Sequence, residues 1–249
     1  MSATIRLGTQ GWSYVDWNGV FYPPGSKQED RLPFYAGVFD TVELDTTFYD
    51  APKPTIARSW ARHTPESFRF AAKLPRAITH EALLRDSAAE FDAFVRSLEP
   101  LGERLGPLLV QMPAEFVRDD DAVRALDTFL AARSEGVRVA VEFRHQSWFA
   151  APVRQLLELH GASLAIGHDA RRQLPVAGPW GELAYLRLHY GSRGRRGNYS
   201  HSELDRWRRR IAAWRSRREV FVYLDNDWEG FAPANARRLQ QGLSVERRE

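Results

Sequence analysis

Short apolar runs recur along the whole chain and are separated by longer stretches in which apolar residues have helical spacing. The runs are rich in β-branched and aromatic residues, and several alternate between apolar and polar positions, which is typical of β-strands. They lie at residues 4–10, 41–46, 68–74, 106–112, 137–143, 162–168, 183–189 and 219–225. The pattern therefore predicts eight strands spread over the chain.

The stretches between most of these strands predict helices. We expect them near 54–62, after Ser87, near 120–133, near 149–159, after Ser200 and near 232–241, the last closed by Gly242. Two of them begin with an S-x-x-E pattern, Ser87 with Glu90 and Ser200 with Glu203, which predicts a capping box at each. Between the sixth and seventh strands, RRQLPVAGPWGE (171–182) has two prolines and two glycines and predicts an irregular loop.

Eight strands alternating with helices in 249 residues match a single (β/α)8 TIM-type barrel, an α/β fold, with this loop in place of the sixth helix. A doubly wound open sheet is the alternative, but such a sheet usually has a glycine-rich first turn. The corresponding segment here, GTQGW (8–12), lacks the G-x-G-x-x-G pattern. The sequence shows no linker or internal repeat, so we expect one domain over residues 1–249.

Alternation along each strand indicates which side chains enter the barrel. In TVELDT (41–46), Val42 and Leu44 should face the helices, and Glu43 and Asp45 should face the interior. The same rule places these polar residues on the inner face at the carboxyl ends of the strands: Gln10, Glu43, Asp45, Lys73, Gln111, Glu142, Arg144, Asp169, Arg187, His189 and Asp225. They should meet in one pocket at the C-terminal mouth, where the active sites of such barrels lie.

Composition narrows the class of protein further. The chain has no cysteine, which excludes disulfides and thiolate metal sites. Its first residues, MSATIRLG, lack the apolar core of a signal peptide, and no apolar run approaches the ~20 residues of a membrane span. We therefore expect a soluble, cytoplasmic protein without a membrane partner.

The net charge of +3 conceals a local positive excess. Residues 187–218 hold eleven arginines and two acidic residues, so this stretch carries +9 and the rest of the chain −6. Its first part, YGSRGRRGNYS (190–200), follows the seventh strand, where such barrels often bind phosphate, and its arginines Arg193, Arg195 and Arg196 suit a phosphate group. The alternative is that residues 190–200 form a solvated charged loop. The arginines of 206–218 are expected to lie on the solvent-exposed face of a helix.

Six motifs in this sequence resemble the YecE-like family, domain of unknown function 72. They are GTQGWSYVDWNGVFYP (8–23), VELDTTFY (42–49), LGPLLVQMP (105–113), VAVEFRHQSW (139–148), YLRLHYG (185–191) and VYLDNDWEGFAPANA (222–236). The resemblance covers nearly the whole chain in order and implies a TIM-type barrel, but it implies no particular reaction. Gln10 and Asp225 depart from the family pattern, which usually has a small hydroxyl residue and an asparagine there.

Glu43 and Glu142 form the best pair of candidate carboxylates for acid and base catalysis. The alternative is that each pairs with an inward-facing base such as Lys73, Arg144 or Arg187. A pocket with both signs of charge suits proton transfer beside a stabilised oxyanion. We therefore expect an enzyme of the hydrolase, lyase or isomerase class, for a small anionic, polyhydroxylated substrate such as a phosphorylated sugar or a nucleotide fragment.

The catalytic candidates are Glu43, Lys73, Glu142, His189 and Asp225. The candidates for substrate binding are Gln10, Trp12, Tyr14, Asp45, Gln111, Arg144, Arg187, Arg193, Arg195, Arg196, Tyr199 and Asn226. Among these, the rings of Trp12 and Tyr14 are suited to stacking on a sugar or a base. His80 and His145 are further candidates for proton transfer.

Two alternatives remain open at this stage. A divalent metal would take Glu142, Asp169, His189 and Asp225 as ligands, although no compact motif such as H-E-x-x-H supports it. A protein that binds nucleic acid would use the basic stretch 187–218, with Tyr190 and Tyr199 available for stacking. The sequence predicts neither a cofactor nor an oligomeric state.

Overall fold

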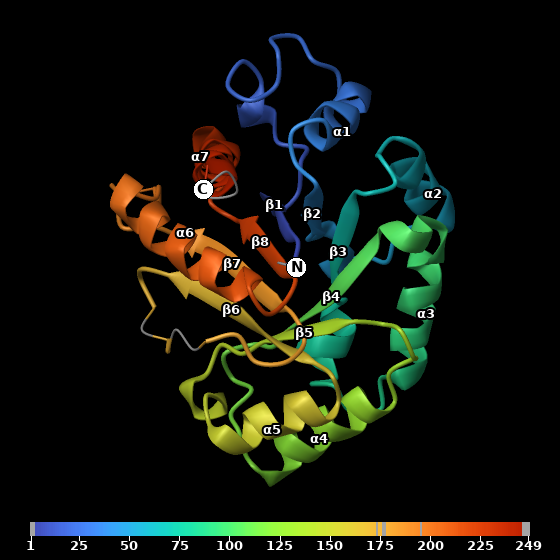
Figure 1. Ribbon diagram of the computed structural model, residues 1–249. Helices are drawn as coiled ribbons and strands as arrows, with labels where there is room; N and C mark the ends of the chain where they lie inside the picture. The colour runs from blue at the N-terminus through green and yellow to red at the C-terminus, as the bar shows by residue number, and fades with distance from the viewer. Residues whose placement is uncertain (1–2, 173, 176–177, 195, 246–249) are drawn as a thin grey trace.

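The computed structural model describes residues 3–172, 174–175, 178–194 and 196–245, and its centre is a barrel of parallel strands (Figure 1). The strands are β1 (Ile5–Thr9), β2 (Thr41–Leu44), β3 (Arg69–Lys73), β4 (Leu105–Gln111), β5 (Val139–Glu142), β6 (Ser163–Asp169), β7 (Ala184–Tyr190) and β8 (Val220–Leu224). Their order is β1-β8-β7-β6-β5-β4-β3-β2. Between β1 and β2 the pairing is reduced to a bridge from Gln10 to Glu43, so the barrel is nearly closed. The predicted strands and barrel fold are confirmed.

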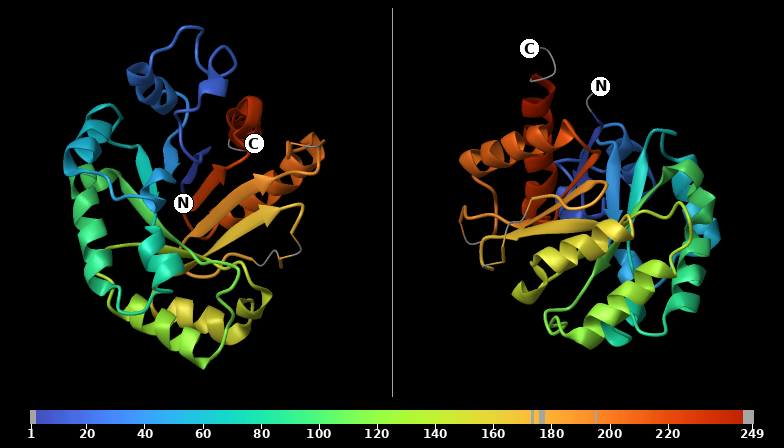
Figure 2. Two further views of the ribbon diagram at one scale, coloured as in Figure 1. Left: turned by 180° about the vertical axis from the view of Figure 1, so that it is seen from behind. Right: turned by 60° about the horizontal axis from the view of Figure 1, so that its bottom comes forward.

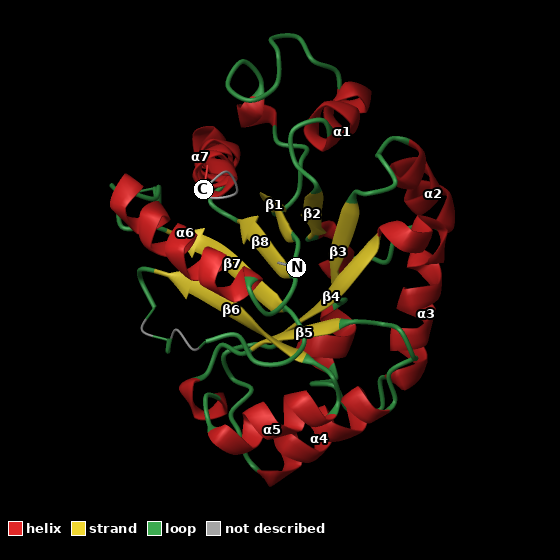
Figure 3. Cartoon of the chain, viewed as in Figure 1, coloured by secondary structure: helices red, strands yellow, loops and turns green. Residues whose placement is uncertain are grey.

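Helices surround the strands on the outside, as Figure 2 and the colouring of Figure 3 show. They are α1 (Gln28–Ala36), α2 (Pro54–Arg62), α3 (Ala88–Leu98), α4 (Asp120–Ala131), α5 (Ala151–Leu159), α6 (His201–Arg215) and α7 (Phe231–Val245). The described residues between β6 and β7 form no helix, as the prolines and glycines of this segment predict. No helix in the described ranges has both the length and the apolar character needed to cross a membrane.

The strand alternation is confirmed, and it separates two apolar layers. Outward side chains such as Val42, Leu44 and Val141 belong to the core between the strands and the helices. The inward residues Ala71, Leu109, Ala140, Ala165, Leu183, Tyr185, Phe221 and Tyr223 form a second buried cluster that fills the middle of the barrel. Polar side chains at the strand ends therefore lie above and below an apolar layer rather than along an open channel.

Three details of the helices differ from the sequence-based predictions. The capping box at Ser200 is present, but the predicted box at Ser87 is wrong, because the Ser87 hydroxyl donates to the carbonyl of Leu84. α7 does not end at Gly242 but continues to Val245. A Cβ atom at Gly242 would lie 2.5 Å from Cδ of Arg208 on α6, so this glycine permits close packing of two helices.

Candidate active site at the barrel mouth

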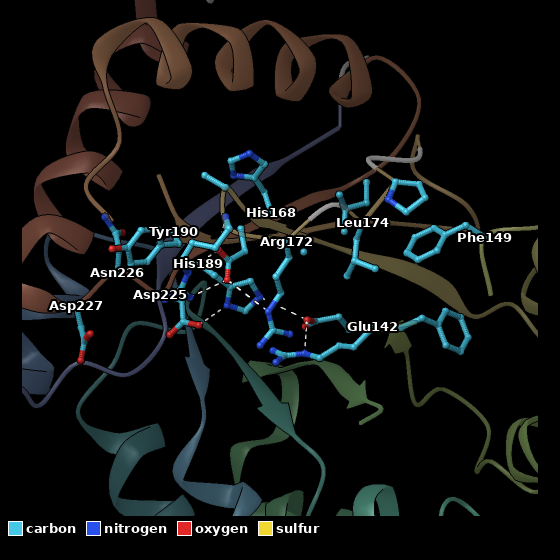
Figure 4. A pocket seen from close by; sticks show the side chains of 18 of the residues that line it. Glu142, Phe149, His168, Arg172, Leu174, His189, Tyr190, Asp225, Asn226 and Asp227 are labelled. Atoms are coloured by element: carbon cyan, nitrogen blue, oxygen red, sulfur yellow. Dashed lines mark hydrogen bonds and ion pairs between the residues drawn. The ribbon is translucent and has the colours of Figure 1, made fainter. Parts of the chain in front are cut away.

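A cavity of about 700 Å³ opens at the carboxyl ends of β5 to β8 (Figure 4). Its polar lining is Glu142, Arg144, His168, Asp169, Arg171, Arg172, His189, Tyr190, Arg196, Asp225, Asn226 and Asp227. Phe149, Leu174 and Pro175 contribute apolar surface. The volume lies within the range of small-molecule sites, about 300–1,000 Å³, and the position is the one expected for an active site in this fold.

Arg187 lies fully buried beside this cavity and joins two carboxylates. Its Nη2 donates to Glu43 at 2.7 Å, its Nε donates to both Glu43 oxygens at 3.0 Å, and its Nη1 donates to Glu142 at 2.6 Å. The hydroxyl of Tyr185 also donates to Glu43 at 2.6 Å. Burial opposes the charge of Arg187, but Glu43 and Glu142 raise its pKa well above the usual value. Burial raises the pKa of Glu43 itself, against the opposing effect of Arg187.

These contacts give Glu43 and Glu142 different roles. Glu43 is fully buried and does not line the cavity, so the ion-pair alternative describes its surroundings better than a catalytic role. Glu142 lines the cavity and also accepts hydrogen bonds from Gln111 and Arg144. Burial alone would raise the pKa of Glu142, but Arg187, His189 and Arg144 together hold it well below its ordinary value. Glu142 is thus an ionised side chain and a weak base.

His189 lies between two carboxylates in the cavity wall, as Figure 4 shows. Its Nδ1 is hydrogen bonded to Asp225, and its Nε2 lies 3.5 Å from Glu142. Burial and the charge of Arg187 lower the pKa of His189, but hydrogen bonds to Asp225 and Glu142 outweigh them, so the pKa is raised. The protonated imidazole is therefore more favoured than in an exposed histidine, and in that form one proton is directed to Asp225 and the other is on the nitrogen near Glu142.

Asp227 is a second perturbed group in the same cavity, and sequence reasoning missed it. Burial, followed by the nearby charge of Asp225, raises the pKa of Asp227. Because a raised pKa makes a carboxylate a stronger base, Asp227 is better suited than Glu142 to accept a proton. The sequence signal that could have indicated Asp227 is its place beside Asp225 and Asn226, directly after β8.

Charges in the cavity are arranged in two layers. The side chains of Arg171, Arg172 and Arg196 are 60%, 48% and 55% exposed at the rim. The carboxylates of Glu142 and Asp169 lie deeper, at 4% and 9% exposure. Arg171 stacks over Tyr190 at 3.8 Å, and Arg196 stacks over Trp228 at 4.5 Å. Of these rim residues only Arg196 was predicted to bind substrate, because it lies in the basic loop after the seventh strand.

Other predicted site residues lie at the same end of the barrel but outside this cavity. Lys73 pairs with Asp45 at 2.9 Å and lies 4.1 Å above the ring of Phe48. Gln10 bridges to Glu43 through the backbone, and Gln111 is buried against Glu142. The eleven polar residues expected at the mouth therefore divide into those packed outside the cavity and those in its wall, rather than lining one space.

The predicted stacking residues have other contacts. Trp12 packs edge-on against Trp60, and Tyr14 packs against Trp17 and donates to the carbonyl of Gln10. Tyr199 is buried, with its hydroxyl beside His168. None of Trp12, Tyr14 and Tyr199 belongs to the described lining of the cavity, so their part in substrate binding stays a prediction.

The backbone of the loop after β7 is hydrogen bonded within the loop itself. The N–H of Gly191 donates to the carbonyl of Gly197, and that of Arg193 donates to the carbonyl of Asn198. Arg193 is exposed outside the cavity, and Arg195 lies outside the described residues. His80 packs against Phe48, and His145 bonds to Ser147, so neither histidine lies in the cavity lining.

The four candidate metal ligands do not form a metal site. Among the described residues, no group of three or more His, Cys, Asp or Glu side chains is placed to hold a metal ion. Both oxygens of Asp169 accept hydrogen bonds from Arg171, and Glu142 is engaged by Arg187. The donors present in this geometry therefore do not fit a metal.

The chain is similar to proteins of one family over nearly its whole length. A family model described as "Protein of unknown function DUF72" matches residues 6–249. UPF0759 protein YecE of Escherichia coli (strain K12) is 34% identical over 146 residues, so the match covers 59% of this chain and about half, 50%, of YecE. UPF0759 protein YunF of Bacillus subtilis (strain 168) is 27% identical over 97% of this chain and 95% of YunF. The crystal structure of a DUF72 family protein from Thermotoga maritima has a TM-score of 0.88 at 28% identity, with 97% of this chain and 99% of that chain covered.

Proposed function

Since this chain belongs to the DUF72 family of proteins of unknown function, we propose from its own geometry that it is an enzyme for a small anionic, polyhydroxylated substrate. The observation that carries this proposal is His189, which is held between Asp225 and Glu142 in the wall of the mouth cavity. Perturbed titrating groups in a cleft are typical of acid and base catalysis. The reaction class is therefore proton transfer at the C-terminal barrel mouth.

The two layers of charge support this class of substrate. Carboxylates accept hydrogen bonds, so Asp169, Asp225 and Asp227 suit the hydroxyl groups of a sugar or polyol. The exposed guanidinium group of Arg172 suits a phosphate or carboxylate near the rim, and that of Arg196 adds positive charge there although it already pairs with Glu229. A phosphorylated sugar or a nucleotide fragment carries both kinds of group. The ring of Phe149 offers an apolar face for the sugar ring or base.

The proposed proton transfers follow from the pKa directions at the site. Protonated His189 donates its Nε2 proton to a substrate oxygen, and Asp225 retains the hydrogen bond to Nδ1. Asp227 accepts a proton from a substrate hydroxyl. Glu142 stays ionised throughout and stabilises the imidazolium before the transfer. Arg187 and Glu43 hold Glu142 in place from below.

The test is turnover of a mixture of sugar phosphates, sugar acids and nucleotides, followed by mass spectrometry. Wild-type protein should convert at least one compound, and His189→Gln should lose roughly 100-fold or more of that rate, as expected for loss of a general acid. His160→Gln is the matched control, because His160 pairs with Asp127 at the surface, and it should keep full activity. Conversion that is equally fast in His189→Gln would contradict the proposal.

A further inference from the structure

Three arginines surround a second cavity at the end of the barrel opposite to the mouth. Arg6 lies in β1, Arg69 begins β3, and Arg138 and Glu219 directly precede β5 and β8. All four therefore lie at the amino ends of strands, whereas His189 and Asp225 lie at the carboxyl ends. The cavity that they line has a volume of about 450 Å³.

The positive charge in this cavity exceeds the negative charge. Glu219 accepts from Arg6 at 2.7 Å and from Arg138 at 2.7 Å. Arg69 has no carboxylate partner within 4.0 Å among the described residues, and its Nη1 donates to the carbonyls of Glu66 and Phe68. With Glu103 included, three guanidinium groups face two carboxylates, which leaves a net charge of +1.

The pKa of Arg69 agrees with an excess of positive charge. Burial lowers this pKa first, and the charges of Arg6 and Arg138 lower it further, against the opposing charges of Glu219 and Glu103. A salt-bridge cluster that served only to close this end of the barrel would pair each of its charged groups. Here the guanidinium of Arg69 bonds only to carbonyl groups and lies near those of Arg6 and Arg138, so a bound anion would reduce the repulsion among the three cations.

The backbone leaves room for a ligand beside these arginines. Gly102 and Gly136 both line the cavity with φ of +54° and +81°. A Cβ atom at either position would meet nothing within 4 Å, so the wall is open at both points. The volume also lies within the range of small-molecule sites, about 300–1,000 Å³.

We propose that the cavity lined by Arg6, Arg69 and Arg138 is a second binding site, which takes a small oxyanion such as the phosphate or carboxylate group of a metabolite. Arg69 is the main anchor, because its guanidinium has no carboxylate partner within reach among the described residues. Arg6 and Arg138 share Glu219 and complete the positive side of the site. This site is independent of the proton transfer proposed at the mouth, because the two lie on opposite sides of the apolar layer that fills the barrel.

The test is titration of the full chain with inorganic phosphate, followed by calorimetry and by thermal unfolding. Arg69→Gln should weaken phosphate binding at this site by roughly tenfold or more. Without phosphate, its Tm should lie close to that of the wild type, because removal of a repulsive charge offsets the lost bonds to the carbonyls of Glu66 and Phe68. Arg58→Gln is the matched control, because it removes one exposed arginine on α2, and it should bind phosphate as the wild type does.

A double variant at the mouth, Arg172→Gln with Arg196→Gln, separates the two cavities. It should keep the phosphate-dependent rise in Tm that Arg69→Gln loses. The proposal is overturned if wild-type protein binds no phosphate, if Arg69→Gln binds it as well as the wild type, or if only the mouth variant loses binding. Loss of turnover in His189→Gln bears on the mouth alone and leaves this result unaffected.

Discussion

Arg187 balances two buried carboxylates, so its removal should be costly. In Arg187→Met, Glu43 and Glu142 would face each other without the cation that now binds both. Removing one partner of a buried ion pair lowers the free energy of unfolding by about 3–5 kcal/mol. We expect a loss of that size in the free energy of unfolding, measured with urea near pH 7. Arg193→Met, which changes an exposed arginine, should cost far less.

The pH dependence of this loss has a definite sign. Without Arg187, burial and mutual repulsion should raise the pKa of both carboxylates in the folded state above the unfolded values. A group whose pKa is raised by folding contributes stability below its unfolded pKa and loses it as the pH rises. The Arg187→Met deficit should therefore shrink as the pH is lowered toward the carboxylate range. A deficit that does not change with pH would contradict the ion-pair assignment.

Asp225 is predicted to keep His189 protonated. The hydrogen bond to Asp225 is the leading contribution that raises the pKa of His189 against burial and the charge of Arg187. Asp225→Asn should therefore lower this pKa, as measured by NMR titration of the imidazole. The stability due to protonated His189 is complete below its unfolded pKa and is lost as the pH rises through the folded pKa. In Asp225→Asn that loss should occur at lower pH.

Asp205→Asn provides a matched control for this titration. Asp205 lies on α6 and is partly exposed near Arg208. The pKa of His189 should be the same in this variant as in the wild type. An equal fall in both variants would show that net charge, and not the contact with Asp225, sets the pKa.

Strand alternation predicted which face each mouth residue occupies but not its depth. Glu43, Glu142 and Arg187 do meet at one end of the barrel, as their positions on the strands require. The rule of alternation cannot distinguish a buried ion pair from a cavity wall, because both lie on the inner face. Arg171, Arg172 and Asp227 were missed because they follow the strands in segments without periodicity.

At the scale of elements, the strands were easier to predict than the helix ends. Each strand is an apolar run with two clear faces, whereas α1 has nine residues with a proline, Pro33, inside it. Its buried residues, Arg31, Leu32 and Tyr35, do not form an apolar stripe that a sequence pattern could reveal. Gly242 shows the same difficulty, since a glycine near a helix end can signal either a C-cap or close packing.

The capping box of α6 also holds the preceding loop. Glu203 accepts from the backbone N–H groups of Ser192 at 3.0 Å and Ser200 at 2.8 Å, and the Ser200 hydroxyl accepts from the N–H of Glu203. Ser200→Ala should lower the free energy of unfolding by about 1 kcal/mol, measured with urea. His201→Ala, in the same turn but exposed, should change it much less. Equal effects would show that the box contributes nothing specific.

At the scale of the whole molecule, the positive excess in 187–218 is less available than its +9 suggests. Arg187 is buried, Arg196 pairs with Glu229, and Tyr199 is buried. Tyr190 is covered by Arg171. These contacts leave fewer charges and rings for nucleic acid than the sequence alone indicates.

We therefore expect only weak binding of short oligonucleotides, with none measurable near physiological salt. Fluorescence anisotropy at several salt concentrations would measure it, with Arg193, Arg195 and Arg196 changed together to alanine as the comparison. Each neutralised phosphate contributes roughly 0.7–0.9 to the slope of log affinity against log salt. A steep slope that the triple variant abolishes would favour the nucleic-acid alternative over the enzyme.

We propose that His189 faces a cavity for an anionic, polyhydroxylated ligand, and NMR of the imidazole nitrogens would detect such a ligand at the histidine itself. Wild-type protein would be titrated with sugar phosphates, sugar acids and their neutral sugars, with His189 assigned from the spectrum of His189→Gln. At least one anionic sugar should shift the His189 signals strongly and those of surface His160 little, and its neutral counterpart should have a smaller effect. The claim is contradicted if no anionic sugar shifts His189, or if neutral sugars shift it as strongly.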